Sequence, residues 1–356
     1  MKELYKCMQV MKESPNAKFA MATIIQVKGS SYRREGAKML IGSDGEMFGT
    51  ISAGCLEEDL YYQALRVLET KETKTVSYDL RSEDDLSWGQ GAGCNGKIDV
   101  YIEPFYWNYI PNYYDSPVSP SVYQYMNKGK RIVSVKYLGD QIQPEFLLFY
   151  SDNQQLLTEP YQTLIVDDVI KPYLEGFLSS GLKTKMIKIN GFENQFLFEI
   201  NEPKDPLFVF GAGPDAEPLV ELASKLDYSV TVIDPRSSRC SNKKFPSADF
   251  LYAEHPEKFL KETQLPSYSY VIVMTHNFNR DQQILRHLAD VPLQYLGVLG
   301  PKDRTSRLLS SKSMINKIHS PIGLNIGADG PEEISVSIMA ELIKIRSEKS
   351  VFTLNR

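Results

Sequence analysis

The residues with the most distinctive chemical setting in this sequence are two cysteines in glycine-rich loops. Cys55 follows Gly49-Thr50-Ile51-Ser52-Ala53-Gly54 and precedes a helix-like segment. A helix dipole stabilises a thiolate at the helix N-terminus, although the carboxylates of Glu57 and Glu58 oppose that effect here. Cys94 lies in a second loop, Trp88–Gly96, which is too rich in glycine to form a packed element. Each loop predicts either a reactive thiolate or a small buried cysteine in a tight turn.

The other cysteines and the nearby basic residues are less specific. Cys7 and Cys240 have ordinary neighbours, and none of the four cysteines belongs to a Cys-x-x-Cys pair. We therefore expect neither a disulfide framework nor a zinc site. Arg33, Arg34 and Lys38 precede the first cysteine loop. They could bind an anionic ligand, or they could be solvated surface charges.

A dinucleotide-binding fingerprint follows an apolar strand in the last part of the sequence. Leu207–Phe210 runs into Gly211-Ala212-Gly213-Pro214-Asp215-Ala216, which matches G-x-G-x-x-G/A and leads into a helix-like stretch. Gly211 permits the tight turn, Gly213 lets a phosphate approach the backbone, and Ala216 allows close helix–strand packing. Asp234 ends the next strand about 20 residues further on, where an acidic side chain holds a ribose hydroxyl. This setting predicts a Rossmann fold, whether or not a dinucleotide binds.

Other residues follow the strands of the same predicted sheet, where open parallel sheets bind ligands. Arg236 could contact a 2′-phosphate or lie at the surface, and His276 could contact a ligand or be a hydrogen-bonded loop histidine. Pro214 fits the first helical turn but removes one N–H group from the phosphate cradle. The glycine-rich stretch 323–330 precedes a long amphipathic helix, and it either leads into a cap of that helix or faces a ligand.

Hydrophobic periodicity predicts the elements that must position these residues. In the first region, strands are expected at 20–27, 38–41, 47–51, 75–80 and 98–102, and helices at 2–12 and 56–68. In the aromatic-rich middle, strands are expected at 131–138 and 146–150 and a helix at 167–178. In the last region, buried strands at 207–210, 229–233, 270–275 and 295–299 precede a helix with an apolar stripe of Ile334, Ile338, Leu342 and Ile345.

These elements predict three regions: an α+β domain at 1–104, a middle segment of mixed strands and helix at 105–203, and a Rossmann-like domain at 204–356. The predicted fold class is α/β, with a C-terminal Rossmann-like doubly wound parallel sheet and an N-terminal α+β lobe. The 356 residues are 42% hydrophobic and 24% charged, which excludes wholesale disorder. A net charge of −5 argues against nucleic-acid binding, and no apolar run is long enough to span a membrane. Because no signal peptide is evident, we expect a cytoplasmic protein.

Several blocks together resemble one family, the xanthine dehydrogenase accessory factors of the XdhC/CoxI type. The matching blocks are rich in small residues and include both cysteine loops. They are Gly29-Ser30 with Arg33 and Gly36–Met39, Gly49–Glu57, Gly93–Gly96, Phe210–Ala216, Val230–Arg236, Met274–His276, Tyr295–Gly300 and Pro321–Ile343. They cover both ends of the chain in the family's order, whereas the middle region matches no block.

The resemblance implies a chaperone that binds molybdenum cofactor, protects it during sulfuration and inserts it into a xanthine dehydrogenase-type apoenzyme. It maps the family's glycine-flanked cysteine to Cys55, beside Gly54 and close to the molybdenum, and its second cysteine to Cys94. Arg34 and Lys38 would neutralise the cofactor phosphate. The sequence departs from the family pattern by Tyr32 in place of Pro, Ala53 and Asn95 in place of Gly, and Pro214 in place of His.

Further expectations concern partners and competing functions. We expect a homodimer, with a cysteine desulfurase as a further candidate partner and NAD(P) as a further candidate cofactor of the Rossmann domain. No catalytic residue is assigned, because a carrier is favoured over a catalyst. The alternative is an NAD(P)-dependent oxidoreductase, although no Tyr-Lys hydride-transfer set is evident. A nucleotide-gated scaffold without cofactor transfer is the third hypothesis.

Overall fold

The computed structural model describes residues 2–52, 54–80, 96–107, 120–139, 146–157, 163–309 and 317–353. By its internal contacts, the chain divides into two compact units, Met1–Pro203 (unit 1) and Lys204–Arg356 (unit 2). A further boundary near residue 104 stays a prediction.

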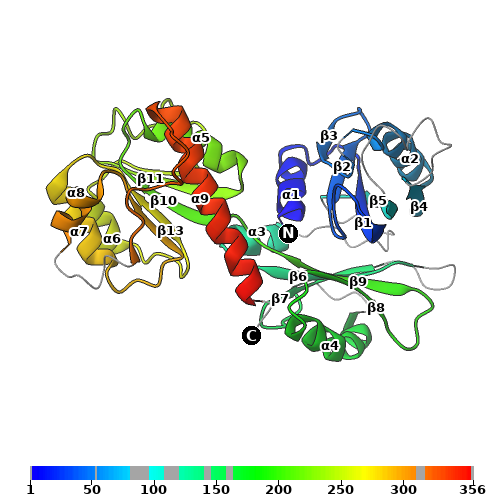
Figure 1. The fold of residues 1–356 in the computed structure, drawn as a ribbon. Coiled ribbons are helices and arrows are strands. Elements are labelled where there is room, and N and C mark those ends of the chain that lie inside the picture. Colours follow the sequence, from blue (N-terminus) through cyan, green and yellow to red (C-terminus); the bar gives the residue numbers. More distant parts are fainter. Residues whose placement is uncertain are drawn as a thin grey trace. The chain divides into compact units, whose positions relative to one another are not determined.

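Unit 1 contains an antiparallel five-stranded sheet that carries the Cys55 loop (Figure 1). Its strands lie in the order β3 (Met47–Gly49), β2 (Lys38–Gly42), β1 (Phe19–Gly29), β5 (Gly96–Phe105) and β4 (Lys74–Asp79). Side chains of β1 alternate between the two faces, as the period of a strand requires. Ala20, Ala22 and Ile24 pack with helix α2 (Glu57–Thr70), whereas Phe19 and Met21 belong to the core on the other face.

The middle of the chain forms a second antiparallel sheet in unit 1. Its strands lie in the order β7 (Phe146–Ser151), β6 (Ile132–Tyr137), β9 (Gln195–Asn201) and β8 (Thr184–Lys188). Helix α4 (Thr163–Ser179) covers one face, where Ile170 and Leu174 pack against Val135 and Phe198. The opposite face meets the first sheet, and helices α1 (Glu3–Glu13) and α3 (Pro120–Asn127) complete the apolar part of that contact.

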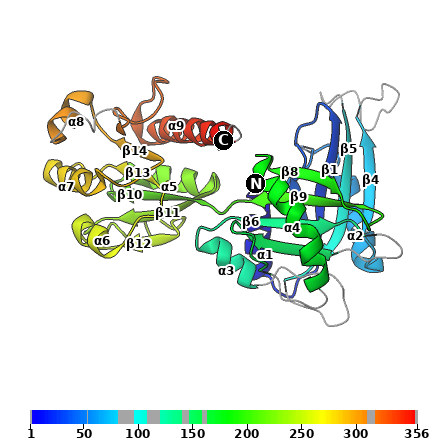
Figure 2. The same ribbon diagram turned by 90° about the horizontal axis from the view of Figure 1, so that it is seen from below.

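Unit 2 is a doubly wound parallel sheet, as the sequence predicts (Figure 2). Its strands lie in the order β12 (Phe250–Tyr252), β11 (Tyr228–Ile233), β10 (Asp205–Phe210), β13 (Tyr270–Val273) and β14 (Tyr295–Val298), and all pairs are parallel. Helices α5 (Ala216–Lys225) and α9 (Gly330–Thr353) cover one face. Helices α6 (Pro256–Glu262), α7 (Phe278–Leu288) and α8 (Lys302–Leu308) cover the other. The carboxyl ends of the central strands therefore lie between the two helical layers, at the end of the sheet where open α/β folds bind ligands.

The elements expected from periodicity are present within a few residues of their predicted bounds. The strand expected at 47–51 ends earlier, at Gly49, because the following residues turn around the Glu57 carboxylate. The sequence did not predict α3, β8, β9, β12, α6, α7 and α8. Helices α6 and α8 are only seven residues long, which is too short for a helical repeat to stand out. In the described part of the chain, no helix is long and apolar enough to cross a membrane.

Candidate functional site

Strand register brings the Arg34 loop and the Cys55 loop to the same end of the first sheet. Met39, near the start of β2, lies opposite Gly49 at the end of β3. The loop that enters β2 therefore ends beside the point where the loop after β3 begins. Arg34 lies in the former loop and Cys55 in the latter, so residues from two resemblance blocks share one region of unit 1.

Strand β5 begins at this end of the sheet as well. Gly96, its first residue, lies opposite Gly29 at the end of β1. A Cβ atom on Gly96 would lie 2.4 Å from the carbonyl oxygen of Ser30, so only glycine fits this close approach. Cys94 precedes this strand by two residues and lies outside the described residues, so its predicted role is not tested.

Glu57, in the first turn of α2, holds the Cys55 loop with its carboxylate. The two carboxylate oxygens accept hydrogen bonds of 2.5–3.2 Å from the loop. The donors are Oγ1 of Thr50, N of Ile51, N and Oγ of Ser52, N of Gly54 and N of Leu56. Burial raises the pKa of Glu57, but the hydrogen bonds from Ser52, Thr50 and Ile51 outweigh burial and lower the pKa to about 2. The loop is therefore wound around a fixed negative charge.

Cys55 is half-buried and lies directly before Leu56, the N-cap residue of α2. Its side chain packs partly against the apolar core beneath α2. Gly54 has φ +109°, and a Cβ atom there would have no heavy-atom neighbour within 4 Å among the described residues. The N–H groups of Gly54 and Leu56 are bound to Glu57 rather than free to face the sulfur. Among the described residues, no group of three or more His, Cys, Asp or Glu side chains could hold a metal ion.

The two basic residues predicted to bind the cofactor phosphate have opposite environments. Arg34 is exposed, and its guanidinium makes no hydrogen bond or ion pair to a described residue. Lys38 is buried on the other face of the sheet, where its Nζ lies 2.7 Å from Oε1 of Glu199. A phosphate role for Lys38 stays a prediction, and it would require breaking this buried pair.

In unit 2, the predicted residues meet at the carboxyl ends of β10, β11 and β13. They are Gly211, Gly213, Ala216, Asp234, Arg236 and His276. Gly211 has φ +121°, and a Cβ atom there would lie 2.4 Å from the carbonyl oxygen of Met274, which explains this glycine by strand packing alone. Ala216 is fully buried in the core between sheet and helix, as its predicted packing role requires. Asp234 pairs with Arg236, and His276 pairs with Asp215.

Sequence reasoning missed two acidic residues at these sites. It treated Glu57 only as a charge that opposes a thiolate, and it gave Asp215 no role. The hydrogen-bond donors around Glu57 belong to a loop that must fold before they converge. Asp215 lies in the turn before α5, whereas its partner His276 follows β13, a distant strand in the sequence. Neither relationship follows from a fixed sequence spacing, so no local signal could have revealed them.

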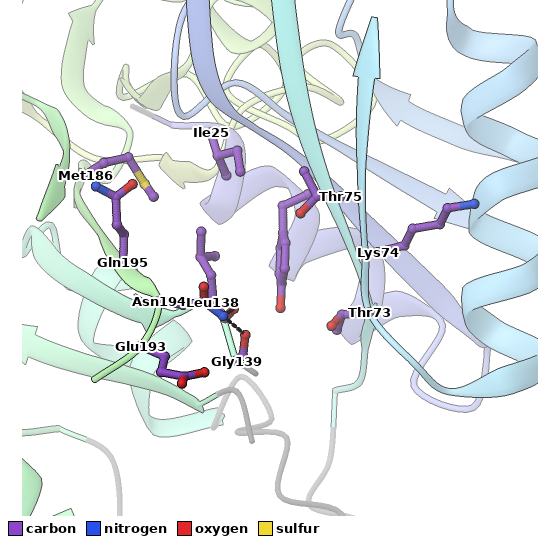
Figure 3. Close-up of a pocket in the computed structure, with 11 residues that line it drawn as sticks. Ile25, Thr73, Lys74, Thr75, Leu138, Gly139, Met186, Glu193, Asn194 and Gln195 are labelled. Atoms are coloured by element: carbon purple, nitrogen blue, oxygen red, sulfur yellow. Dashed lines mark hydrogen bonds between the residues drawn. The ribbon is translucent and has the colours of Figure 1, made fainter. Parts of the chain in front are cut away.

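The structure also contains a cavity that holds none of the predicted site residues (Figure 3). It has a volume of about 380 Å3 and lies between the two sheets of unit 1. Ile25, Leu138 and Met186 form its apolar part, and the amide of Asn194 bonds the carbonyl oxygen of Gly139 at its edge. Ile25 points to the face opposite that of Ile24, which packs with α2. The cavity therefore lies on the other side of the first sheet from α2.

Comparison with known proteins gives these sites a family context. A model described as the XdhC and CoxI family matches residues 14–79, and a model described as the XdhC Rossmann domain matches residues 207–342. The chain is 40% identical over 332 residues to a Bacillus subtilis (strain 168) protein described as a probable subunit of xanthine dehydrogenase. This alignment covers 93% of the chain and 94% of the relative.

Two further matches extend the comparison. The molybdenum cofactor insertion chaperone PaoD of Escherichia coli (strain K12) is 21% identical over 333 residues, which cover 92% of this chain and 83% of PaoD. A crystal structure from Bacillus halodurans, described as a xanthine dehydrogenase, has a TM-score of 0.78 and 37% identity, and it covers 98% of this chain and 96% of its own. The range matched by the first model contains the Arg34 and Cys55 loops, and the range matched by the second contains the carboxyl ends of the parallel strands.

Proposed function

The chain belongs to the XdhC and CoxI family, and from this membership we propose that it binds molybdenum cofactor, protects it for sulfuration and inserts it into a xanthine dehydrogenase-type apoenzyme. The names of two relatives support an accessory role with molybdoenzymes. PaoD is named as a molybdenum cofactor insertion chaperone, and the Bacillus subtilis relative as a probable subunit of xanthine dehydrogenase. In this proposal the cofactor is cargo, and the chain carries it rather than catalysing a reaction.

The observation that carries the proposal is the meeting of the Arg34 loop and the Cys55 loop at one end of the first sheet. An anionic cofactor with a soft metal needs a sulfur ligand and a cation within reach of one another. The half-buried Cys55 offers the sulfur, and the exposed Arg34 offers a guanidinium that no described residue occupies. No described residue fills the space beside Gly54 that a ligand would take.

Each residue of this region has a distinct task in the proposal. Sγ of Cys55 lies next to the molybdenum, and Arg34 donates charge-assisted hydrogen bonds to the cofactor phosphate. Glu57 fixes the loop by accepting hydrogen bonds from Ser52 and Gly54. Lys38, which the resemblance places among the phosphate ligands, would have to leave Glu199, through which it joins the two sheets, in order to reach the phosphate.

Cofactor retention by cysteine variants tests this proposal. Isolated molybdenum cofactor is bound anaerobically to the full-length chain, and the bound fraction is measured after gel filtration. We expect Cys55→Ala to retain far less cofactor than the wild type and Cys94→Ala to retain somewhat less. Cys240→Ala is the matched control, because Cys240 is buried in unit 2. Equal retention by Cys55→Ala and wild type, with equal melting temperatures, would exclude the thiolate role.

The proposal extends to assembly and partners. A labile cofactor needs protection from water, and a two-fold dimer is the commonest closed assembly. We therefore propose a homodimer in the cytoplasm that receives sulfur from a cysteine desulfurase. Sedimentation at micromolar concentration tests the dimer, and a purely monomeric profile would contradict it. Transfer of cofactor to a xanthine dehydrogenase-type apoenzyme, measured as activation, tests the insertion step.

A further inference from the structure

The dinucleotide fingerprint of unit 2 lies in its expected setting, but its phosphate position is filled by a side chain of the protein itself. In a Rossmann fold the second glycine of the turn lets the pyrophosphate approach the backbone. Here Oδ1 of Asp215 lies 2.1 Å from the position that a Cβ atom of Gly213 would take. The space that glycine leaves for a phosphate is therefore occupied by a carboxylate.

This carboxylate is held in place from the other side of the turn. Nε2 of His276 donates a hydrogen bond of 2.8 Å to Oδ2 of Asp215. His276 has φ +56°, a left-handed conformation that is uncommon for a residue other than glycine. Oδ1 of Asp215 is buried and has no hydrogen-bond partner among the described residues. A pyrophosphate placed here would meet a negative charge that no described hydrogen-bond donor satisfies at Oδ1.

The ribose position is also closed by internal contacts. Asp234 is 1% exposed, and both of its oxygens already accept hydrogen bonds. Oδ1 accepts from N and Nε of Arg236 at 2.9 and 2.8 Å, and Oδ2 accepts from Nη2 of Arg236 at 2.7 Å and from N of Ala212 at 2.9 Å. A ribose hydroxyl would have to displace a bidentate ion pair, which is among the stronger polar contacts in proteins.

A third feature weakens the cradle further. Pro214 has no N–H group, so the turn between Gly213 and Asp215 offers one donor fewer than a usual phosphate loop. The glycine at 211 does not require a ligand either, since its position against Met274 explains it by packing. The turn thus keeps the backbone of a dinucleotide site while side chains of the protein already occupy both the phosphate position and the ribose position.

We infer that unit 2 excludes NAD and NADP, and that Asp215 is the specificity-determining residue that closes the phosphate position. This inference is independent of the cofactor role proposed for unit 1, because it concerns only residues of unit 2. It predicts a gain of binding when the carboxylate is removed, which a merely degenerate site would not show.

Fluorescence titration of the full-length chain with NADH and NADPH tests the inference, with inorganic pyrophosphate as competitor. We expect no saturation of the wild type up to millimolar nucleotide. Asp215→Ala removes the carboxylate, and with it both the negative charge and the atoms that occupy the phosphate position. This variant is expected to bind the nucleotides at least tenfold more tightly than the wild type. Glu221→Ala is the control, because Glu221 lies on the helix that follows Asp215, is exposed and pairs with the exposed Lys225.

Asp215→Asn separates the two causes of exclusion, since the amide keeps the shape and removes the charge. Binding by the Asn variant assigns exclusion to charge, and binding by the Ala variant alone assigns it to occupied space. Micromolar binding by the wild type would overturn the inference. Absence of binding in both variants, with circular dichroism and melting temperature like those of the wild type, would overturn it equally, because Asp215 would then not be the barrier.

Discussion

Nζ of Lys38 lies 2.7 Å from Oε1 and 2.8 Å from Oε2 of Glu199, and both side chains are less than a tenth exposed. The pair joins β2 of the first sheet to β9 of the second, which are far apart in the sequence. A second buried pair, Lys136 with Glu103, joins the same two sheets. A lone buried charge is far more costly than a paired one, so each residue of these two pairs depends on its partner for stability.

Removing one member of the first pair should therefore destabilise unit 1 strongly. We expect Lys38→Met to lower the free energy of unfolding by about 3–5 kcal/mol, because Glu199 is left buried and unpaired. The double variant Lys38→Met/Glu199→Met should recover most of that loss, since two apolar side chains replace the pair. Urea unfolding measures both. A Lys38→Met protein of wild-type stability that retains less cofactor would instead support the phosphate role.

Glu57 should make the stability of unit 1 depend on pH in the acid range. Its pKa of about 2 lies below the ordinary value of 4.5, so its contribution is complete above about pH 4.5 and is lost as pH falls toward 2. We expect Glu57→Gln to cost roughly 2 kcal/mol at pH 7, after discounting for its partial exposure, and progressively less toward pH 2. Glu58→Gln is the control, because Glu58 is an exposed neighbour in the same helical turn. A constant difference between wild type and Glu57→Gln from pH 7 to pH 2 would contradict this prediction.

The sequence predicted the parallel sheet of unit 2 and the strands of the first sheet because burial there follows simple periods. Leu207 and Val209 alternate with Phe208 and Phe210 between two helical layers, so these four successive residues of β10 are all apolar. The second sheet was only half identified. Glu199 and Asn201 interrupt β9 with polar side chains that are nonetheless buried: Glu199 pairs with Lys38 of the first sheet, and the amide of Asn201 donates to Oγ of Ser134 in β6. A polar residue that is satisfied by a distant partner carries no local sign of its burial.

Arg34 should contribute to cofactor binding without contributing to stability. It is exposed and makes no ion pair with a described residue, so its loss leaves no buried charge. A charge-assisted hydrogen bond is worth about 1.5–3 kcal/mol, so Arg34→Ala should weaken retention roughly tenfold or more. Arg131→Ala removes an exposed arginine of the same unit and serves as control. Equal retention by the two variants would remove Arg34 from the proposed site.

Two glycines in left-handed backbone should respond differently to the same substitution. Gly54 and Gly211 have φ +109° and +121°, so alanine is strained at both positions. A Cβ atom at Gly54 would meet no described residue within 4 Å, whereas one at Gly211 would lie 2.4 Å from the backbone oxygen of Met274. We expect Gly54→Ala to cost about 1–2 kcal/mol of strain.

Gly211→Ala should cost about 3 kcal/mol or more, because β10 and β13 must also separate at that point. Chemical denaturation monitored separately in each unit, by tryptophan fluorescence for unit 1 and by hydrogen exchange of β10 amides for unit 2, measures both losses. Equal costs for the two substitutions would show that the turn at Gly211 relaxes easily, and the glycine would then need a ligand to explain it.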